Sequence, residues 1–150
     1  MRLRDMLDED SVKIGLECFD KEECFEEMAD ILVRAGRVSD RAKVLEAVRR
    51  RESEGSTGIG RGVAVPHGKC DGLSSTVLAL GISRDGIEFD SVDGKPVKVV
   101  LMILGSADEP GKHLQTLAEV VRLIRVPGFC ERLENATDVK TVLDIIDGEE

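Results

Sequence analysis

The longest apolar run in the chain, from Val97 to Leu104, constrains the fold more than any other segment. It is interrupted only by Lys98, and it is far shorter than the roughly 20 residues that a membrane-spanning helix needs. A valine-rich run of this length is typical of a strand that is buried on both faces of a sheet. We therefore expect a sheet that is covered by helices, and no direct insertion into a membrane.

Two amphipathic helices are predicted in the first third of the chain. Over residues 21–35, apolar residues recur at the spacing of a one-faced helix, and Asp20 is placed to be its N-cap. A second helix begins after Ser39 or Asp40 and ends in the basic residues 49–51, which suit the negative end of a helix dipole. Each of these helices therefore has one apolar face to bury.

The rest of the chain alternates short strands with helices. A long helix begins near Pro110, and its apolar residues follow the spacing of a buried face: Leu114, Leu117, Ala118, Val121 and Ile124. The other predicted elements are strands at 63–65 and 76–82, a strand starting at 86–89, and short helices at 129–135 and 138–146. No repeat or linker divides the chain. We predict a single α/β domain over residues 1–150, with a small mixed sheet covered by helices.

The composition argues against several classes of function. The formal net charge is −9 and the chain has no Trp or Tyr. A nucleic-acid site needs a basic face, and a single-strand site also needs aromatic residues on which bases stack. The four cysteines lack zinc-ligand spacing, so we expect no metal and interpret them as reduced thiols in a cytoplasm. The N-terminal residues carry no apolar segment of a signal peptide, which also favours a cytoplasmic protein.

Glycine is concentrated between Gly55 and Gly68, where it occupies five of fourteen positions. Such a loop lets backbone N–H groups approach an anion closely, which suits phosphate. The P-loop pattern fails because Val63 stands where its first glycine is needed, and the pattern G-x-G-x-x-G fails at the same residue. We therefore expect no nucleotide and no other cofactor.

His67 follows the predicted strand at 63–65, and the ends of strands are where sites are built in α/β proteins. A neutral imidazole attacks phosphorus and later releases the group, because a histidine phosphoramidate stays reactive. The cations and hydroxyl donors that a phosphoryl group needs are available nearby in Arg51, Lys69, Ser56 and Thr57. The chemistry alone does not separate this nucleophile from a turn histidine that donates to a carbonyl.

His113 is the only other histidine, and it lies near the N-terminus of the predicted long helix. The helix dipole disfavours an imidazolium there, so a neutral ring N–H could steady a phosphate or hold the nucleophilic ring. The alternative is an ordinary surface histidine in the first turn.

One long motif lies between residues 51 and 69. It runs Arg51-Glu-x-x-Gly-Ser-Thr-Gly-Ile-Gly-x-Gly-Val-Ala-Val-Pro-His67-Gly-Lys, and it is followed by Phe89-Asp-x-x-Asp-Gly-x-Pro-Val-x-Val-Val and His113-Leu-x-x-Leu-Ala. Together these motifs resemble the IIA domains of the bacterial phosphotransferase system, in the fructose/mannitol class that includes the nitrogen-regulatory IIA protein. The likeness covers nearly the whole chain.

The resemblance implies a role for several residues. His67 matches the phosphorylated histidine of the family, which usually carries the group on Nε2, while Arg51 and His113 match its active-site arginine and second histidine. Ser56 and Thr57 match the motif, and we expect them to bind phosphate. Cys70 lies outside the pattern, and we expect an exposed, oxidisable thiol. The resemblance also implies a mixed sheet between helices.

Three hypotheses about function remain open on the sequence alone. The resemblance implies an HPr-like phosphocarrier protein as the donor to His67, and either a sugar-specific IIB domain or a regulated target protein as the partner that follows. The Gly-Ser-Thr-Gly-Ile-Gly loop and the lack of a fused IIB or IIC segment favour regulation slightly. The third hypothesis, from a different class, is a small-anion-binding domain that uses the Gly55–Gly62 loop without phosphoryl transfer.

Overall fold

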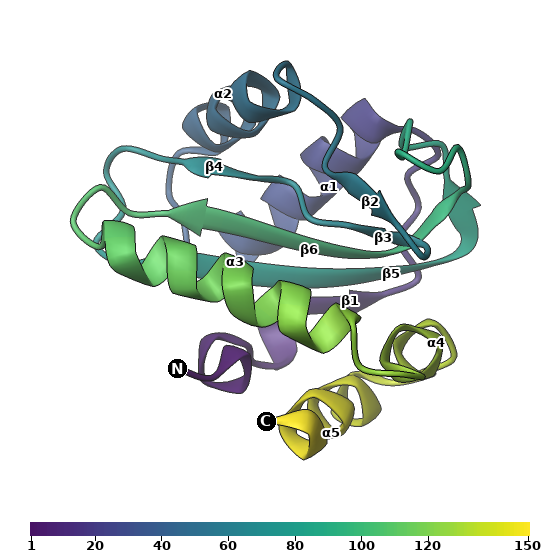
Figure 1. Cartoon of the computed structure of the whole chain (residues 1–150). Helices are drawn as coiled ribbons and strands as arrows, with labels where there is room; N and C mark the ends of the chain where they lie inside the picture. The colour runs from purple at the N-terminus through teal and green to yellow at the C-terminus, as the bar shows by residue number, and fades with distance from the viewer.

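The computed structural model describes all residues, 1–150, and is built around one mixed sheet (Figure 1). The strands are hydrogen-bonded in the order β1-β5-β6-β3-β2, and β4 also pairs with β6. They are β1 (Val12–Ile14), β2 (Gly58–Gly60), β3 (Val63–Ala64), β4 (His67–Lys69), β5 (Val77–Ile87) and β6 (Val97–Gly105). The prediction of a single α/β domain with a small mixed sheet covered by helices is confirmed.

The strands β3 and β4 lie one after the other along the same edge of β6, and both are parallel to it. Val63 is paired with Val99, and His67 is paired with Ile103. The two strands are separated by Pro66, which has no N–H to donate to a sheet, although its carbonyl still accepts from Ile103 N at 3.0 Å. His67 is therefore the first residue of a strand that β6 holds in register.

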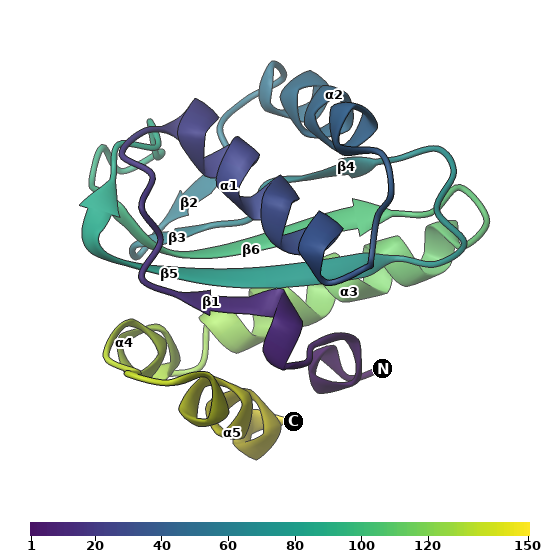
Figure 2. The ribbon, with the colours of Figure 1, turned by 180° about the vertical axis from the view of Figure 1, so that it is seen from behind.

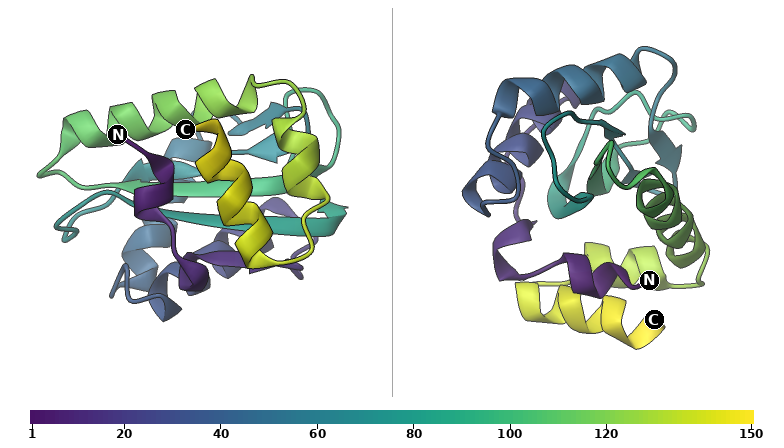
Figure 3. Two further views of the ribbon diagram at one scale, coloured as in Figure 1. Left: turned by 90° about the horizontal axis from the view of Figure 1, so that it is seen from below. Right: turned by 90° about the vertical axis from the view of Figure 1, so that its left-hand side faces the viewer.

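Helices cover both faces of the sheet, as Figures 2 and 3 show. Helices α1 (Lys21–Arg34) and α2 (Arg41–Glu52) lie on one face. On the other face lie α3 (Pro110–Ile124), α4 (Phe129–Glu134) and α5 (Val139–Glu149), with two 3-10 turns, η1 (Leu3–Met6) and η2 (Glu9–Ser11), near the N-terminus. Asp20 caps α1 by accepting from Glu23 N at 2.9 Å, as predicted.

The core consists of two apolar clusters, one on each side of the sheet, and β6 contributes to both. Val100, Met102 and Leu104 point toward α1 and α2, whereas Val99, Leu101 and Ile103 point toward the other helices. All six side chains are buried. This alternation confirms the predicted strand that is buried on both faces, and it explains why the run is almost entirely apolar.

Several predicted elements differ from the structure. Residues 86–87 do not start a new strand; they end β5 after an irregularity in its pairing with β6 that follows Ile82. The prediction ended a strand at Pro66, but pairing resumes at once in β4. Two short strands, β1 and β2, were not predicted. The three residues of β1 are too few to show the alternation of a strand, and the Gly-Ile-Gly sequence of β2 does not show it either.

Helix α3 starts at Pro110 as predicted, but its buried face only partly coincides with the predicted one. The residues that it buries are His113, Thr116, Val120, Leu123 and Ile124. Of the predicted buried positions, Leu114 is 69% exposed and Val121 is 40% exposed. Of the same predicted positions, Ile124 is buried and Leu117 is partly buried against the core, so the prediction was wrong for Leu114, Ala118 and Val121 only.

Removal of a buried side chain from β6 should leave a cavity and lower the stability of the whole domain. Met102→Ala removes a fully buried side chain from the middle strand, and we expect a loss of about 3 kcal/mol in the free energy of unfolding. Urea denaturation with an unchanged m-value measures this loss. Lys98→Ala on the same strand is the control, because Lys98 is exposed and should change stability by less than about 0.5 kcal/mol.

Candidate functional site

The site is built where α2 packs onto β4. A Cβ atom at Gly68 would lie 2.6 Å from the carbonyl oxygen of Ala47, so only glycine allows the α2 backbone to approach β4 this closely. This contact brings the last turn of α2, with Arg50 and Arg51, beside His67. The sequence places these residues far apart, and one backbone contact brings them together.

An open cleft of about 440 Å³ lies between α2, β4 and the start of α3. Three cations face it from α2 and β4, against the single carboxylate of Glu54. The lining residues are Ala47, Arg50, Arg51, Glu54, His67, Gly68, Lys69 and His113. In a chain of net charge −9, this concentration of cations makes the cleft suitable for an anion.

The ring of His67 is fixed by one hydrogen bond. Its Nδ1 atom lies 2.8 Å from the carbonyl oxygen of Val65. A carbonyl only accepts, so the hydrogen sits on Nδ1 and the neutral ring keeps its lone pair on Nε2. Burial lowers the pKa of His67 below its ordinary value, and the nearby Arg51 lowers it further, although the bond to Val65 opposes this shift. The ring is therefore neutral near pH 7.

His113 lies at the end of the first turn of α3 and faces His67. The ring centroids are 6.0 Å apart and the ring planes meet at 46°. The ring packs against Gly105 at the end of β6, where a Cβ atom would lie 2.5 Å from His113 Cγ and Nδ1. Burial lowers the pKa of His113, and the neighbouring His67 and Lys69 lower it further. The cleft thus holds two neutral imidazoles.

The structure places the predicted phosphate-binding residues Ser56 and Thr57 outside the lining of the cleft. The backbone N and Oγ1 of Thr57 donate to the carboxylate of Glu52 at 3.0 Å and 2.6 Å, while Ser56 Oγ accepts from Gly58 N. Arg51 does line the cleft, and its Nη1 donates to the carbonyl of Gly55 at 3.0 Å. The phosphate-binding role of Ser56 and Thr57 stays a prediction, and their present contacts hold the loop together.

Some features of the site were missed at the sequence level. Gly105 packs against His113 and Glu52 holds the glycine-rich loop, and neither role was predicted. The only signal in the sequence was for Glu52, which follows Arg51 in the motif. The prediction of an exposed Cys70 was wrong, since its side chain is buried with 4% exposure. Burial also raises the pKa of its thiol. No group of three or more His, Cys, Asp or Glu side chains is placed to hold a metal ion.

The fold and the cleft define a small α/β protein with two neutral imidazoles in an open, cation-lined cleft at its surface. The family model of the phosphoenolpyruvate-dependent sugar phosphotransferase system, EIIA 2, matches residues 5–149. The chain belongs to this family.

The chain is similar in sequence to relatives of both sugar-specific and regulatory types. The chain is 40% identical over 126 residues to the fructose-specific EIIA component of Haloferax volcanii, with 84% of the chain and 82% of that protein covered. It is 31% identical over 149 residues to the nitrogen regulatory protein of Klebsiella oxytoca, covering 97% and 90%. It is also 34% identical over 146 residues to the fructose-specific EIIABC component of Bacillus subtilis, but spans only 23% of that protein.

Solved structures show the same fold. The nitrogen regulatory protein IIA-Ntr from Neisseria meningitidis has a TM-score of 0.88 at 30% identity, with 96% of the chain and 98% of that structure covered. IIA mannitol from Escherichia coli has a TM-score of 0.80 at 24% identity, covering 93% and 98%, and supports the fold alone. None of the helices combines the length and the apolar character that a membrane span requires.

The two histidines should titrate below their ordinary pKa. We expect both ring titrations, followed by NMR, to have midpoints below 6.5. The unfolded chain takes up these protons first, so the free energy of unfolding should fall as the pH is lowered from about 6.5 toward the folded pKa values. In His67→Gln, the pKa of His113 should rise because a neighbouring positive charge is removed. A midpoint at or above 6.5 in either ring would contradict the burial argument.

A methyl group at Gly105 should displace His113. In Gly105→Ala, the new Cβ overlaps the His113 ring, so we expect the ring resonances of His113 to shift and those of His67 to change less. Gly111→Ala is the matched control, because Gly111 lies in the first turn of the same helix with no atom near its Cβ position. Equal His113 spectra in both variants would show that the ring has room to move.

Proposed function

We propose that the chain is a phosphohistidine carrier of the phosphoenolpyruvate-dependent phosphotransferase system, and that His67 accepts the phosphoryl group. The observation that carries this proposal is the bond from His67 Nδ1 to the carbonyl of Val65. It commits the lone pair to Nε2 in a cleft that is open to a protein partner and lined by cations. The phosphotransferase family to which the chain belongs supports the same chemistry.

The transfer needs no proton donor or metal. His67 Nε2 attacks the phosphorus of a phosphohistidine on the donor, the Nε2–P bond forms, and the N–P bond of the donor breaks. The electron pair of the broken bond returns to the donor nitrogen. Because a phosphoramidate stays reactive, the same steps in reverse order deliver the group to the next acceptor.

The cleft supplies the charge that such a group requires. A phosphoryl group adds about −1.5 to −2 charges near neutral pH, and Arg51 and Lys69 line the space beside His67. We assign Arg51 and His113 to the group's oxygens, the first as a cation and the second as a neutral N–H donor. Ser56 and Thr57 are proposed to help only if their loop rearranges, because Thr57 is now bonded to Glu52.

We propose an HPr-like phosphocarrier protein in the cytoplasm as the donor, and either a IIB domain or a regulated target protein as the partner that follows. A relative of fructose-specific type and a relative of nitrogen-regulatory type support the two destinations equally. One solved structure with this fold is a complex of IIA mannitol with phosphorylated IIB mannitol from Escherichia coli. The geometry around His67 serves both destinations, since each requires only that a second protein reach Nε2.

The decisive measurement is intact-mass spectrometry at neutral to mildly alkaline pH, after incubation with enzyme I, HPr and phosphoenolpyruvate. We expect a gain of one acid-labile phosphate, because Nε2 of His67 is accessible and unprotonated. His67→Ala should gain none. His113→Ala should still gain one, at a changed rate, because it removes a donor to the phosphoryl oxygens and leaves the nucleophile.

A failure to gain phosphate with any matched donor would mean that the carrier proposal is wrong. Titration with inorganic phosphate then tests the alternative of a small-anion-binding domain that uses the Gly55–Gly62 loop. Phosphate binding that is lost in Arg51→Gln, with no covalent product, would support that alternative.

A further inference from the structure

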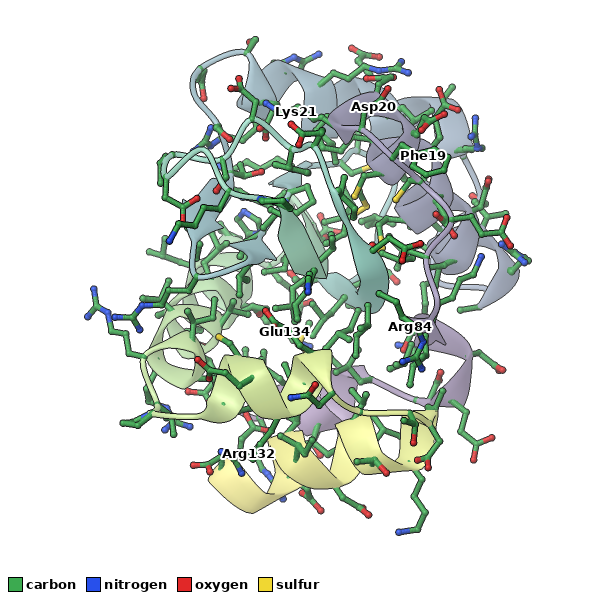
Figure 4. All side chains as sticks on the ribbon, turned by 90° about the vertical axis from the view of Figure 1, so that its right-hand side faces the viewer. Phe19, Asp20, Lys21, Arg84, Arg132 and Glu134 are labelled. Carbon is green, nitrogen blue, oxygen red and sulfur yellow. The ribbon has the colours of Figure 1, made fainter.

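Lys21 is the first residue of α1, and its ammonium group is held in one place although it does not line the cleft. Its Nζ atom lies 3.0 Å from Glu52 Oε1 and 5.3 Å from the centroid of the Phe89 ring. The exposed carboxylate of Asp90 lies 3.9 Å away on another side. Figure 4 shows Lys21 beside Asp20 in the upper part of that view. The side chain is thus fixed between the start of α1, the end of α2 and the segment after β5.

Lys21 supplies the only cation within 4.0 Å of the carboxylate of Glu52. The side chain of Glu52 is 7% exposed, and its other contacts are the neutral donors N and Oγ1 of Thr57. A nearly buried carboxylate that loses its counter-ion has to draw in water, a proton or another cation. Arg51 is the next residue in the chain. Lys21 therefore satisfies a charge that would otherwise compete with the cleft for Arg51.

The turn that follows α2 links Glu52 to the orientation of Arg51. Arg51 Nη1 donates to the carbonyl of Gly55 at 3.0 Å, and Gly55 N donates to the carbonyl of Glu52 at 3.1 Å. Two residues further on, the carboxylate of Glu52 holds Thr57. The acceptor of Arg51 thus lies within a short segment that Glu52 ties at both ends. Release of Thr57 would free this segment, and Arg51 would lose the carbonyl that orients it.

We propose that Lys21 is a positioning residue for phosphoryl transfer to His67: it keeps Glu52 on the glycine-rich loop and so leaves Arg51 to the cleft. This inference rests on the proposed function, in which Arg51 provides a cation for the oxygens of the phosphoryl group. Lys21 itself does not touch that group. It acts through one carboxylate and one turn, from a helix that lies outside the cleft.

The same contacts give a role to Phe89, which belongs to the second motif of the sequence and does not line the cleft. The Phe89 ring is buried and packs edge-on against Phe25, with 5.8 Å between the ring centroids. A cation over a ring face is attracted by the ring quadrupole. A Cβ atom at Gly58 would lie 3.0 Å from Phe89 Cδ1, so the loop backbone also lies against this ring. One fixed ring therefore supports both Lys21 and the loop.

A second ion pair of the chain provides a matched control. Lys13 Nζ lies 2.7 Å from Glu27 Oε2, and the side chains are 30% and 13% exposed, against 25% and 7% for Lys21 and Glu52. Glu27 also holds a loop, because it accepts from Cys18 N at 2.9 Å. Neither Lys13 nor Glu27 lines the cleft. Loss of this pair therefore tests the effect of stability without an effect on Arg51.

The experiment measures how fast phosphoramidate labels variants of the intact chain, followed by intact-mass spectrometry well below the unfolding temperature of each variant. This donor is small and needs no docking surface. In Lys21→Met we expect labelling about tenfold slower, the size expected when one charge-assisted hydrogen bond to the transferred group is misaligned. Lys21→Arg should recover most of the rate, because it restores the cation beside Glu52. Lys13→Met should be labelled at the wild-type rate.

A double variant tests the route through Arg51. In an Arg51→Gln background, Lys21→Met should cause no further loss, because the residue through which Lys21 acts is already gone. A further tenfold loss in that background would mean that Lys21 does not act through Arg51.

The remaining outcomes separate the inference from the proposed function. Wild-type labelling of Lys21→Met, or an equal loss in Lys13→Met, means that Lys21 contributes to stability alone and the inference is wrong. If neither phosphoramidate nor phosphorylated HPr labels His67 in the wild type, the proposed function itself is wrong and the inference falls with it.

Discussion

The geometry of the cleft depends on two close approaches that only glycine permits. At Gly68, the carbonyl of Ala47 comes so near β4 that α2 is held against the strand that carries His67. At Gly105, the ring of His113 occupies the space where a side chain would stand. Gly68 lies in β4 and Gly105 ends β6. Because these two strands are paired, both close approaches are made to the same rigid part of the sheet. The two imidazoles are therefore positioned by the backbone, and not by contacts that side chains can easily alter.

The loop beside the cleft is organised by a nearly buried carboxylate. The side chain of Glu52 is 7% exposed, and it accepts from Thr57 and pairs with Lys21 at 3.0 Å. A buried charge is tolerated when it is paired and fully hydrogen-bonded. Glu52 thus ties the end of α2 to the glycine-rich run and to the start of α1. Its neighbour Arg51 lines the cleft, so two adjacent residues of opposite charge lie on different sides, one at the loop and one at the cleft.

Local signals in the sequence predicted much of this structure. The apolar run of β6, the cap at Asp20 and the proline at the start of α3 each act within a few residues, and all three were predicted correctly. The resemblance to a known family assigned His67, Arg51 and His113 to one site, which periodicity could not do. The failures involve tertiary contacts: β4 exists because β6 offers it partners, and Thr57 points to Glu52 because α1 and α2 meet there. Leu114, Ala118 and Val121 of α3 were mistaken for buried residues because exposed apolar residues on a helix can have the same spacing as buried ones.

The two chain ends lie side by side on the face of the sheet opposite α2 (Figure 3). The carboxylate of Glu150 accepts from Leu3 N and Arg4 N at 2.8 Å and 3.0 Å, and Arg2 pairs with Asp147. A domain whose ends meet in this way can be inserted into another polypeptide, or joined to one by either end, with little strain. The cleft between α2, β4 and the start of α3 is lined by neither end. Attachment to a longer chain is thus compatible with the geometry of the fold, since neither chain end lines the cleft.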